Sequence, residues 1–279
     1  MRLRLLRTTR ALLALFSITA VSCRKVDLAK PAPPSGFVDR TFHSNALQRD
    51  VTYRARYANG LPSNAPIHVI YLLHGNGESY RTWSTASTVA RDAPAEDVLV
   101  MPDGGSSYFM NSATVAADRY EDFLTTDLIA DAERDLKEPV IRTAMGNSMG
   151  GFAAIVLAFK HPELYGSVIA LSPPVDYPQR RFKLSRPSQS FAIRAIFGPA
   201  GSPARSANDP FELIKRLEPQ QAPNLFIECG DEESLMAPIR RFDALLTKRH
   251  FQHRLRINHG GHNWQQWNSV LTSVFTKMQ

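Results

Sequence analysis

Residues 143–151 read TAMGNSMGG, a stretch that crowds three glycines around Ser148. Five of these residues fit the pattern G-x-S-x-G, which is short enough to recur by chance. The flanks make it informative, because a strand-like run (PVIRTAMG, residues 139–146) leads into it and an apolar helix-like run (GFAAIVLAFKHP, residues 151–162) leads out of it. The sequence therefore predicts a sharp strand-to-helix turn in which glycines relieve crowding and the serine hydroxyl is held up as a nucleophile.

Short apolar runs alternate with longer stretches of helical spacing along the rest of the chain. Strands are predicted at residues 67–75, 97–104, 139–146, 166–173, 224–230 and 253–258. Helices are predicted at residues 119–137, 151–162, 240–250 and 264–278. Because strands that are apolar throughout alternate with helices, we predict a mostly parallel sheet covered on both faces. Residues 38–44 and 50–57 are strand-like without following helices, which predicts an antiparallel edge at the N-terminal end of the sheet.

A nucleophilic serine needs backbone N–H groups that bind the negative charge forming on the substrate oxygen. The residue after the nucleophile, Met149, supplies one such amide at the start of the predicted helix. The second amide is expected in the loop after the strand at residues 67–75. That loop reads HGNGE, residues 74–78, and the Asn76 amide is predicted to complete the oxyanion hole.

The serine hydroxyl also needs a general base, and the base needs a carboxylate that orients it. A serine between a strand and a helix is typical of the α/β-hydrolase fold, in which the three residues follow the chain order serine, acid, histidine. The C-terminal stretch NHGGHNWQQW, residues 258–267, offers His259 and His262. Paired glycines precede His262 and a helix-like stretch follows it, so we predict His262 as the base.

The orienting carboxylate is expected directly after the strand at residues 224–230. Three acidic residues follow that strand, namely Asp231, Glu232 and Glu233. Spacing alone does not choose among them, because each lies within a few residues of the end of the strand. The residues by themselves thus locate the acid in this loop and leave its identity open.

The first 22 residues differ from the rest of the chain. They hold four arginines, no acidic residue and the apolar run ALLALFSITAV, which is the layout of a secretory signal peptide. The run AVSC resembles a bacterial lipobox, although Ala20 stands where Leu is usual, and it predicts Cys23 as a lipidated mature N-terminus. Residues 23–36 are rich in proline and predict a tether, which leaves residues 37–279 for the globular domain. We therefore expect an exported protein, either in the cell envelope with a membrane tether through Cys23 or secreted.

The composition indicates no nucleic-acid partner. The chain holds 33 basic and 26 acidic residues, a net charge of +7, but four of the arginines lie in residues 1–22. Without that segment the net charge is 29 minus 26, or +3, which is unremarkable. The two cysteines are Cys23 and Cys229, so we expect a fold that does not depend on a disulfide. Cys229 ends an apolar run, where a small buried residue is typical.

Residues 172–210 show little regular pattern. A long irregular insert in a compact domain is often a lid or a binding loop, so we expect this segment to shape the acyl or alcohol pocket. It contains the arginine-rich stretch QRRFKLSR, residues 179–186. A solvated surface loop is the favoured interpretation of that stretch, and recognition of an acidic substrate or a lipid headgroup is the alternative. The sequence predicts no oligomeric state.

Several blocks of the sequence resemble those of one known family. They read YLLHGNGES, RYEDFLTTDLI, AMGNSMGGFAAIVLAFKHPELYGSVIALSPP, FGPAGSPARSANDP, LFIECGDEESL and GGHNWQQW. Together they resemble the esterase D family, which includes S-formylglutathione hydrolases, feruloyl-type esterases and the secreted mycolyltransferases. The resemblance implies an α/β-hydrolase fold and action on esters or thioesters, with no cofactor and no metal ion.

Carried onto this chain, the resemblance places the nucleophile on Ser148 and the base on His262, with oxyanion amides at Asn76 and Met149. The acid is where the chain departs from the family. Relatives often read Cys-Gly-Thr-x-Asp-x-Leu where this chain reads CGDEESL, which places the acid on Glu233. Glutamate serves this role in the mycolyltransferase branch. Asp231 is the alternative acid, being shorter and close by.

The sequence thus predicts an exported serine carboxylic ester hydrolase that acts through a Ser-His-acid triad and an acyl-enzyme intermediate. An acyltransferase that uses the same acyl-enzyme is the alternative, and a non-catalytic binding protein on a hydrolase scaffold is a third interpretation. Export favours a carbohydrate ester or an envelope lipid as substrate over a cytosolic thioester.

Overall fold

The computed structural model describes residues 32–57, 65–137, 139–181 and 187–276. The predicted signal peptide, residues 1–22, and Cys23 lie outside the described residues, as does most of the predicted tether. Among the described segments, no helix is both long enough and apolar enough to cross a membrane.

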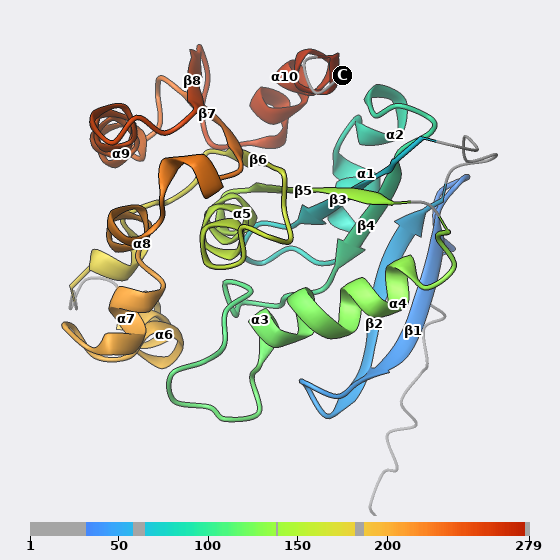
Figure 1. The fold of residues 1–279 in the computed structure, drawn as a ribbon, viewed down its shortest axis with the longest axis horizontal. Coiled ribbons are helices and arrows are strands. Elements are labelled where there is room, and N and C mark those ends of the chain that lie inside the picture. The colour runs from blue at the N-terminus through green and yellow to red at the C-terminus, as the bar shows by residue number, and fades with distance from the viewer. Residues whose placement is uncertain (1–31, 58–64, 138, 182–186, 277–279) are drawn as a thin grey trace, which may run out of the picture. The chain divides into compact units, whose positions relative to one another are not determined.

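The centre of the described domain is an eight-stranded sheet in the order β1-β2-β4-β3-β5-β6-β7-β8 (Figure 1). The strands are β1 (Val38–Ser44), β2 (Arg49–Arg56), β3 (Ile67–Leu73), β4 (Val98–Pro102), β5 (Val140–Asn147), β6 (Ser167–Leu171), β7 (Asn224–Gly230) and β8 (His253–Asn258). β2 pairs antiparallel with both β1 and β4, and all other neighbouring strands are parallel. The predicted fold class, a mostly parallel sheet with an antiparallel N-terminal edge, is confirmed.

Ten α-helical segments are described around the sheet. They are α1 (Thr82–Ala86), α2 (Val89–Asp92), α3 (Tyr120–Asp122), α4 (Leu128–Glu133), α5 (Met149–Lys160), α6 (Pro187–Phe197), α7 (Pro203–Ala207), α8 (Pro210–Arg216), α9 (Met236–Lys248) and α10 (Trp264–Thr276). A π-helical turn, η1 (Phe123–Asp127), joins α3 to α4 in one continuous helix. Short 3-10 turns follow at η2 (Tyr177–Gln179) and η3 (Pro219–Gln221).

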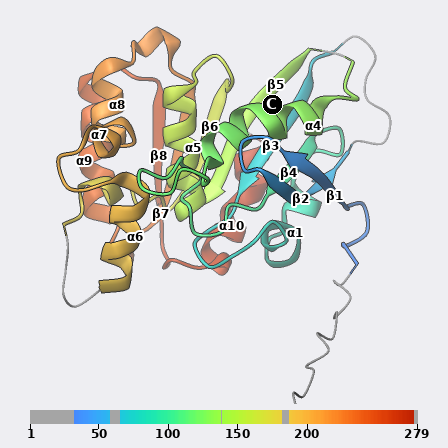
Figure 2. The same cartoon turned by 90° about the horizontal axis from the view of Figure 1, so that it is seen from below.

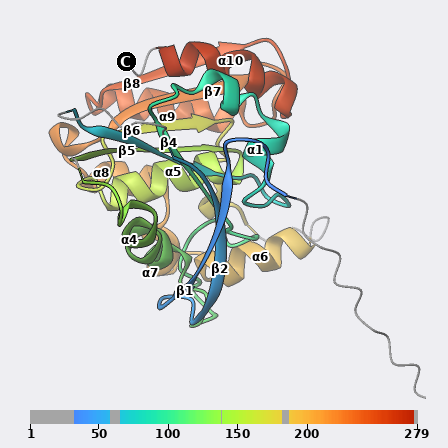
Figure 3. The same ribbon diagram turned by 90° about the vertical axis from the view of Figure 1, so that its right-hand side faces the viewer.

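Alternate residues of the central strands belong to two separate apolar cores. On β3, the side chains of Val69, Tyr71 and Leu73 pack into the core that contains buried residues of α4, α5, α8 and α9. Ile70 and Leu72 belong to the opposite core, with buried residues of α1, α2 and α10. Successive side chains of a strand point to opposite faces, so a strand that is apolar throughout requires cover on both sides. Figure 3 shows this arrangement, with α10 on one side of the sheet and α4 and α5 on the other.

The prediction of an irregular insert at residues 172–210 was wrong, because the segment contains the helices α6 and α7 beside α8 (Figure 2). Ile193, Ile196 and Phe197 of α6 are buried at helical spacing, so the helical signal was present in the sequence. α7 begins with a Ser202 cap, whose side chain accepts a hydrogen bond from the Arg205 amide. α7 has only five residues, and both helices begin at a proline and lie close to a glycine, which hid their periodicity.

Cys229 lies on β7 and is fully buried, as the sequence predicted for a small apolar-like residue. Burial raises the pKa of its thiol to about 12. A thiol in this environment is not ionised at neutral pH and has little nucleophilic character.

Candidate active site

Ser148 occupies the sharp turn between β5 and α5, with backbone angles φ 51° and ψ −115°. A non-glycine residue at positive φ is strained by about 1–3 kcal/mol, so the surrounding contacts must hold it there. The Ser148 amide donates to the Leu171 carbonyl oxygen at 2.8 Å, and the Ser148 carbonyl oxygen accepts from the Phe152 amide at 3.0 Å. These two bonds attach the serine to β6 on one side and to α5 on the other.

Two glycines permit the close approach of the three elements at this turn. A Cβ at Gly150 would lie 2.0 Å from the Leu73 carbonyl oxygen, at the end of β3. A Cβ at Gly146 would lie 2.3 Å from the Gly150 carbonyl carbon. Both distances join fixed backbone atoms, so no larger residue fits at either position. The glycines of the motif therefore serve close backbone packing beneath Ser148.

The structure brings Ser148, His262 and Glu233 into one hydrogen-bonded chain. The Ser148 Oγ lies 2.8 Å from His262 Nε2, and His262 Nδ1 lies 2.6 Å from Glu233 Oε2. A carboxylate only accepts hydrogen bonds, so Nδ1–H donates to Glu233 and the Nε2 lone pair faces the serine hydroxyl. Ser148, Glu233 and His262 follow β5, β7 and β8, whose carboxyl ends meet at one edge of the parallel sheet.

Glu233 is held by groups that sequence reasoning missed. Its side chain is 1% exposed, and its Oε1 accepts from Ser172 Oγ at 2.5 Å and from the Gly230 amide at 3.0 Å. Trp267 Nε1 in turn donates to Ser172 Oγ at 2.9 Å. Burial opposes ionisation of Glu233, but hydrogen bonds from His262, Ser172 and Gly230 outweigh it and lower the pKa of the carboxyl. Glu233 is therefore ionised at neutral pH, and its anionic form faces the imidazole.

Asp231, the alternative acid, does not reach His262. It is exposed, and its Oδ1 accepts from the Gly260 amide at 3.1 Å and lies 3.3 Å from His259 Nδ1. His259, with a side chain 83% exposed, also lies 3.8 Å from Glu232. Asp231, Glu232 and His259 place one possible ligand atom each within reach of a common metal ion, and they are the one such cluster among the described residues. All three side chains are exposed.

The two residues predicted to supply oxyanion amides, Met149 and Asn76, both lie at the site of Ser148. Met149 is the first residue of α5, where the N–H groups of a helix have no intrahelical acceptor. Asn76 follows β3 and lines the same cavity as Ser148 and His262. One residue thus begins a helix and the other lies in a loop, both at the edge of the sheet that carries Ser148.

Glu78 is a further residue that sequence reasoning missed. Its Oε2 accepts from the Gly75 amide at 2.7 Å and from Asn147 Nδ2 at 3.2 Å, and its Oε1 accepts from Trp264 Nε1 at 2.7 Å. The Glu78 carboxylate thus connects three parts of the site. They are the loop that carries Asn76, the residue Asn147 directly before Ser148, and the segment just after His262. The acid was visible in the sequence HGNGE, but two of its three partners, Asn147 and Trp264, are distant along the chain.

We expect Glu78→Gln to lower kcat about ten- to a hundredfold, because misplacing catalytic groups by an ångström has effects of that size. Glutamine offers one acceptor oxygen, while its amide N–H group would face donors. Measuring kcat and KM on 4-nitrophenyl acetate checks this, with the exposed Glu163→Gln as the matched control. A lower melting temperature with unchanged kcat would reduce Glu78 to a structural role.

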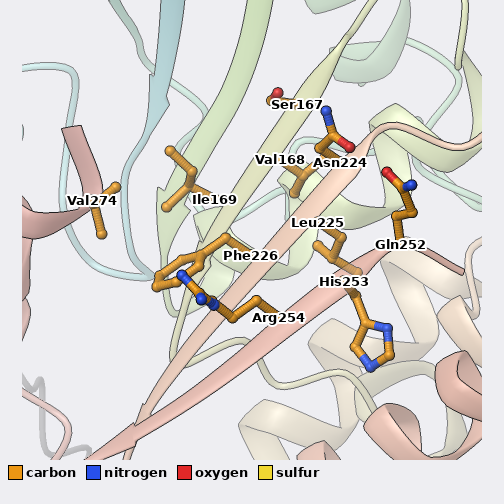
Figure 4. Close-up of a pocket in the computed structure, with 10 residues that line it drawn as sticks. All are labelled: Ser167, Val168, Ile169, Asn224, Leu225, Phe226, Gln252, His253, Arg254 and Val274. Carbon is orange, nitrogen blue, oxygen red and sulfur yellow. The ribbon is translucent and has the colours of Figure 1, made fainter. Parts of the chain in front are cut away.

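Ser148 and His262 open into a cavity of about 620 Å³, within the usual size range of small-molecule sites. The other lining residues are Asn76, Ser106, Tyr108, Pro174, Tyr177, Arg180, Ala192, Glu233, Ser234 and Leu235. A second cavity, of about 340 Å³, lies at the amino ends of β6, β7 and β8, where Ser167, Asn224 and His253 begin those strands (Figure 4). That end of the strands is opposite to the one that carries Ser148.

The sheet is mostly parallel, and a strained serine lies at a strand-to-helix turn. The serine is hydrogen-bonded to a histidine, which is hydrogen-bonded to a buried carboxylate. These features define the class of α/β-hydrolases. Residues 44–278 match the family described as "Putative esterase", and the chain belongs to this family.

Individual relatives agree with this assignment. An acetyl esterase from Caldicellulosiruptor saccharolyticus is 22% identical over 260 residues, covering 85% of this chain and 96% of the relative. The diacylglycerol acyltransferase/mycolyltransferase Ag85C of Mycobacterium leprae is 23% identical over 248 residues, covering 76% of this chain and 74% of the relative. FphF, a fluorophosphonate-binding serine hydrolase of Staphylococcus aureus, shares the fold with a TM-score of 0.73 at 19% identity, covering 87% of this chain and 97% of that chain. The predicted family resemblance is confirmed, and the protein is a serine esterase.

Proposed function

We propose that the protein is an exported carboxylic ester hydrolase in which Ser148 is the nucleophile, His262 the general base and Glu233 the orienting acid. One observation carries the proposal: Ser148 Oγ, His262 and the buried Glu233 form an unbroken chain of hydrogen bonds of 2.8 and 2.6 Å. Nucleophilic catalysis by a serine requires this order of groups, because the hydroxyl attacks only as it loses its proton.

In the first half of the proposed reaction, Ser148 Oγ attacks the ester carbonyl carbon while His262 Nε2 takes the hydroxyl proton. Glu233 stays ionised and stabilises the imidazolium that forms. The carbonyl oxygen becomes an oxyanion that accepts hydrogen bonds from the amides of Asn76 and Met149. Such a donor contributes about 3–4 kcal/mol to lowering the barrier. His262 then returns the proton to the leaving alcohol, and the acyl group remains on Ser148.

In the second half, water attacks the acyl-enzyme with His262 again accepting a proton. A second oxyanion forms at the same two amides and collapses with Ser148 Oγ as the leaving group. His262 returns the proton to Ser148, and the free acid departs. The cycle uses the residues of this chain and water, and we propose no cofactor.

An acyltransferase is the second candidate, and the likeness to the Ag85C relative favours it as the alternative. Its acyl-enzyme would be the same, with a sugar or lipid hydroxyl in place of water. Analysing the products of an aryl ester in the presence of glucose, trehalose or glycerol separates the two functions. Hydrolysis predicts free acid as the main product, whereas transfer predicts acylated acceptor.

Export is proposed from residues 1–22 and lipidation from Cys23. This location favours carbohydrate esters, such as acetylated or feruloylated polysaccharide, or envelope lipids as substrates. Expressing the full chain in a bacterial host with radiolabelled palmitate tests the proposal. Label should enter the wild type and not Cys23→Ala, and unlabelled protein confined to the cytoplasm would contradict both export and lipidation.

The catalytic proposal is tested by incubating the protein with a fluorophosphonate, which reacts with activated serines. Peptide mass spectrometry should find the adduct on Ser148, and the labelled protein should lose hydrolysis of 4-nitrophenyl acetate. A panel of aryl and sugar esters of varied acyl length then defines the substrate. Folded protein that neither takes up the label nor cleaves any of these esters would disprove the assignment.

A further inference from the structure

Arg180 lies in the wall of the cavity that contains Ser148 and His262. Its side chain is 28% exposed. Among the described residues that line this cavity, Arg180 is the one with a fixed positive charge, and Glu233 is the one carboxylate. Both oxygens of Glu233 are already hydrogen-bonded within the protein. Among the described lining residues, the charged group with free hydrogen-bonding capacity is therefore the Arg180 guanidinium.

The guanidinium of Arg180 has a defined orientation. Its central carbon lies 4.9 Å from the ring centroid of Tyr177, and that ring stacks on Tyr108 with centroids 4.3 Å apart. Asp176 Oδ1 accepts a hydrogen bond from Arg180 Nη2 at 3.0 Å. An arginine stacked on an aromatic face loses less conformational entropy when it binds an anion than a mobile surface arginine does.

The backbone that carries Arg180 is also anchored. Nη1 of Arg205, on α7, donates to the carbonyl oxygens of Pro178 and Arg180 at 3.1 and 2.9 Å. The same guanidinium donates to the Gly198 carbonyl oxygen through Nε and Nη2, at 3.2 and 2.7 Å. A single side chain thus connects the segment around Arg180 to the end of α6. This support holds the arginine in place relative to the cavity.

Arg180 retains donors that can bind a ligand. A guanidinium has five N–H groups, and within the described part of the chain Asp176 is the one acceptor bonded to them. The ion pair with Asp176 offsets part of the positive charge, but it uses a single donor. The remaining N–H groups form a planar fork that matches two oxygens of one anion.

We propose that Arg180 is a specificity-determining residue that binds an anionic group, a carboxylate or a phosphate, carried by the ester substrate. The fork of Arg180 would hold the anion, while the rings of Tyr108 and Tyr177 pack against the carbon atoms between the anion and the ester. This inference rests on the proposed function, since it takes Ser148 as the group that attacks the ester. It adds a charge requirement to the substrate class.

Matched pairs of esters test the proposal in three arms. 4-Acetoxybenzoate against 4-acetoxybenzamide places a carboxylate on the alcohol side, and monomethyl glutarate against methyl pentanoate places it on the acyl side. 4-Acetoxyphenyl phosphate replaces the carboxylate by a phosphate, and 4-acetoxybenzamide is again its neutral partner. The variants are Arg180→Gln and, as the matched control, Arg181→Gln, which changes an exposed neighbouring arginine that does not line the cavity.

In at least one arm, Arg180→Gln should lower kcat/KM for the anionic ester about tenfold more than for its neutral partner, because a charge-assisted hydrogen bond is lost. Arg181→Gln should leave that ratio within about twofold. Equal effects of Arg180→Gln on both members of every pair would overturn the proposal. If the Arg180→Gln variant does not fold, the kcat/KM values of the wild type test the proposal instead. A wild type that prefers the neutral ester in every pair also overturns the proposal.

Failure of this inference is distinguishable from failure of the proposed function. If the wild type cleaves neutral esters and the Ser148→Ala variant does not, the catalytic assignment is upheld. This conclusion does not depend on the result for Arg180→Gln. If Ser148→Ala cleaves them as well as the wild type does, the proposed nucleophile is wrong, and the role of Arg180 falls with it.

Discussion

Ser148→Ala is expected to lower kcat for ester hydrolysis by about 10⁵- to 10⁶-fold, the size of effect seen when a serine nucleophile is removed from a complete triad. The alanine leaves His262 and Glu233 in place but removes the oxygen that attacks the carbonyl carbon. Residual activity would come from the oxyanion amides and from binding, acting on a water molecule. KM should change far less than kcat, because the cavity walls are intact.

The measurement is steady-state hydrolysis of 4-nitrophenyl acetate together with fluorophosphonate labelling. Ser206→Ala is a suitable control, since Ser206 lies on α7 and does not line the cavity. It should retain both activity and label. A Ser148→Ala protein that is folded and still hydrolyses the ester at the wild-type rate would place the nucleophile elsewhere.

Glu233→Gln is expected to lower kcat by about 10⁴-fold, as replacing a triad carboxylate by its amide does in serine proteases. The amide cannot stabilise the imidazolium, and its N–H group opposes the His262 tautomer in which Nδ1 donates. The substitution also disturbs the bonds from Ser172 and the Gly230 amide, which both need an acceptor. The loss should therefore appear in kcat, with substrate binding changed much less.

Asp231→Asn is the matched control for Glu233→Gln, because it makes the same change of charge two residues away. Asp231 contacts the Gly260 amide and His259, so its replacement should change kcat less than about threefold, as expected for an exposed group outside the triad. Circular dichroism and melting temperatures establish that both variants are folded. Loss of activity in Asp231→Asn with full activity in Glu233→Gln would reverse the assignment of the acid.

Much of the fold was predictable because its signals are local. Three signals each depend on residues close together in the chain: strands that are apolar throughout, glycines at a strand end, and helical spacing between strands. The limits of β1, β7 and β8 therefore agree with the predicted segments. The helices α6 and α7 were missed because each begins at a proline in a stretch interrupted by Pro and Gly, where the periodic signal is weak.

The sequence by itself determined the sheet, the turn at Ser148 and the choice of His262 over His259, since each follows from the order of neighbouring residues. Which carboxylate contacts His262 was decided by the tertiary structure. Asp231 and Glu233 are equivalent by spacing, but Ser172 after β6 and the loop before α10 meet around Glu233 and leave Asp231 at the surface. The positions of Glu78 and Arg180 have the same origin, because their partners lie on elements that only the folded chain brings together.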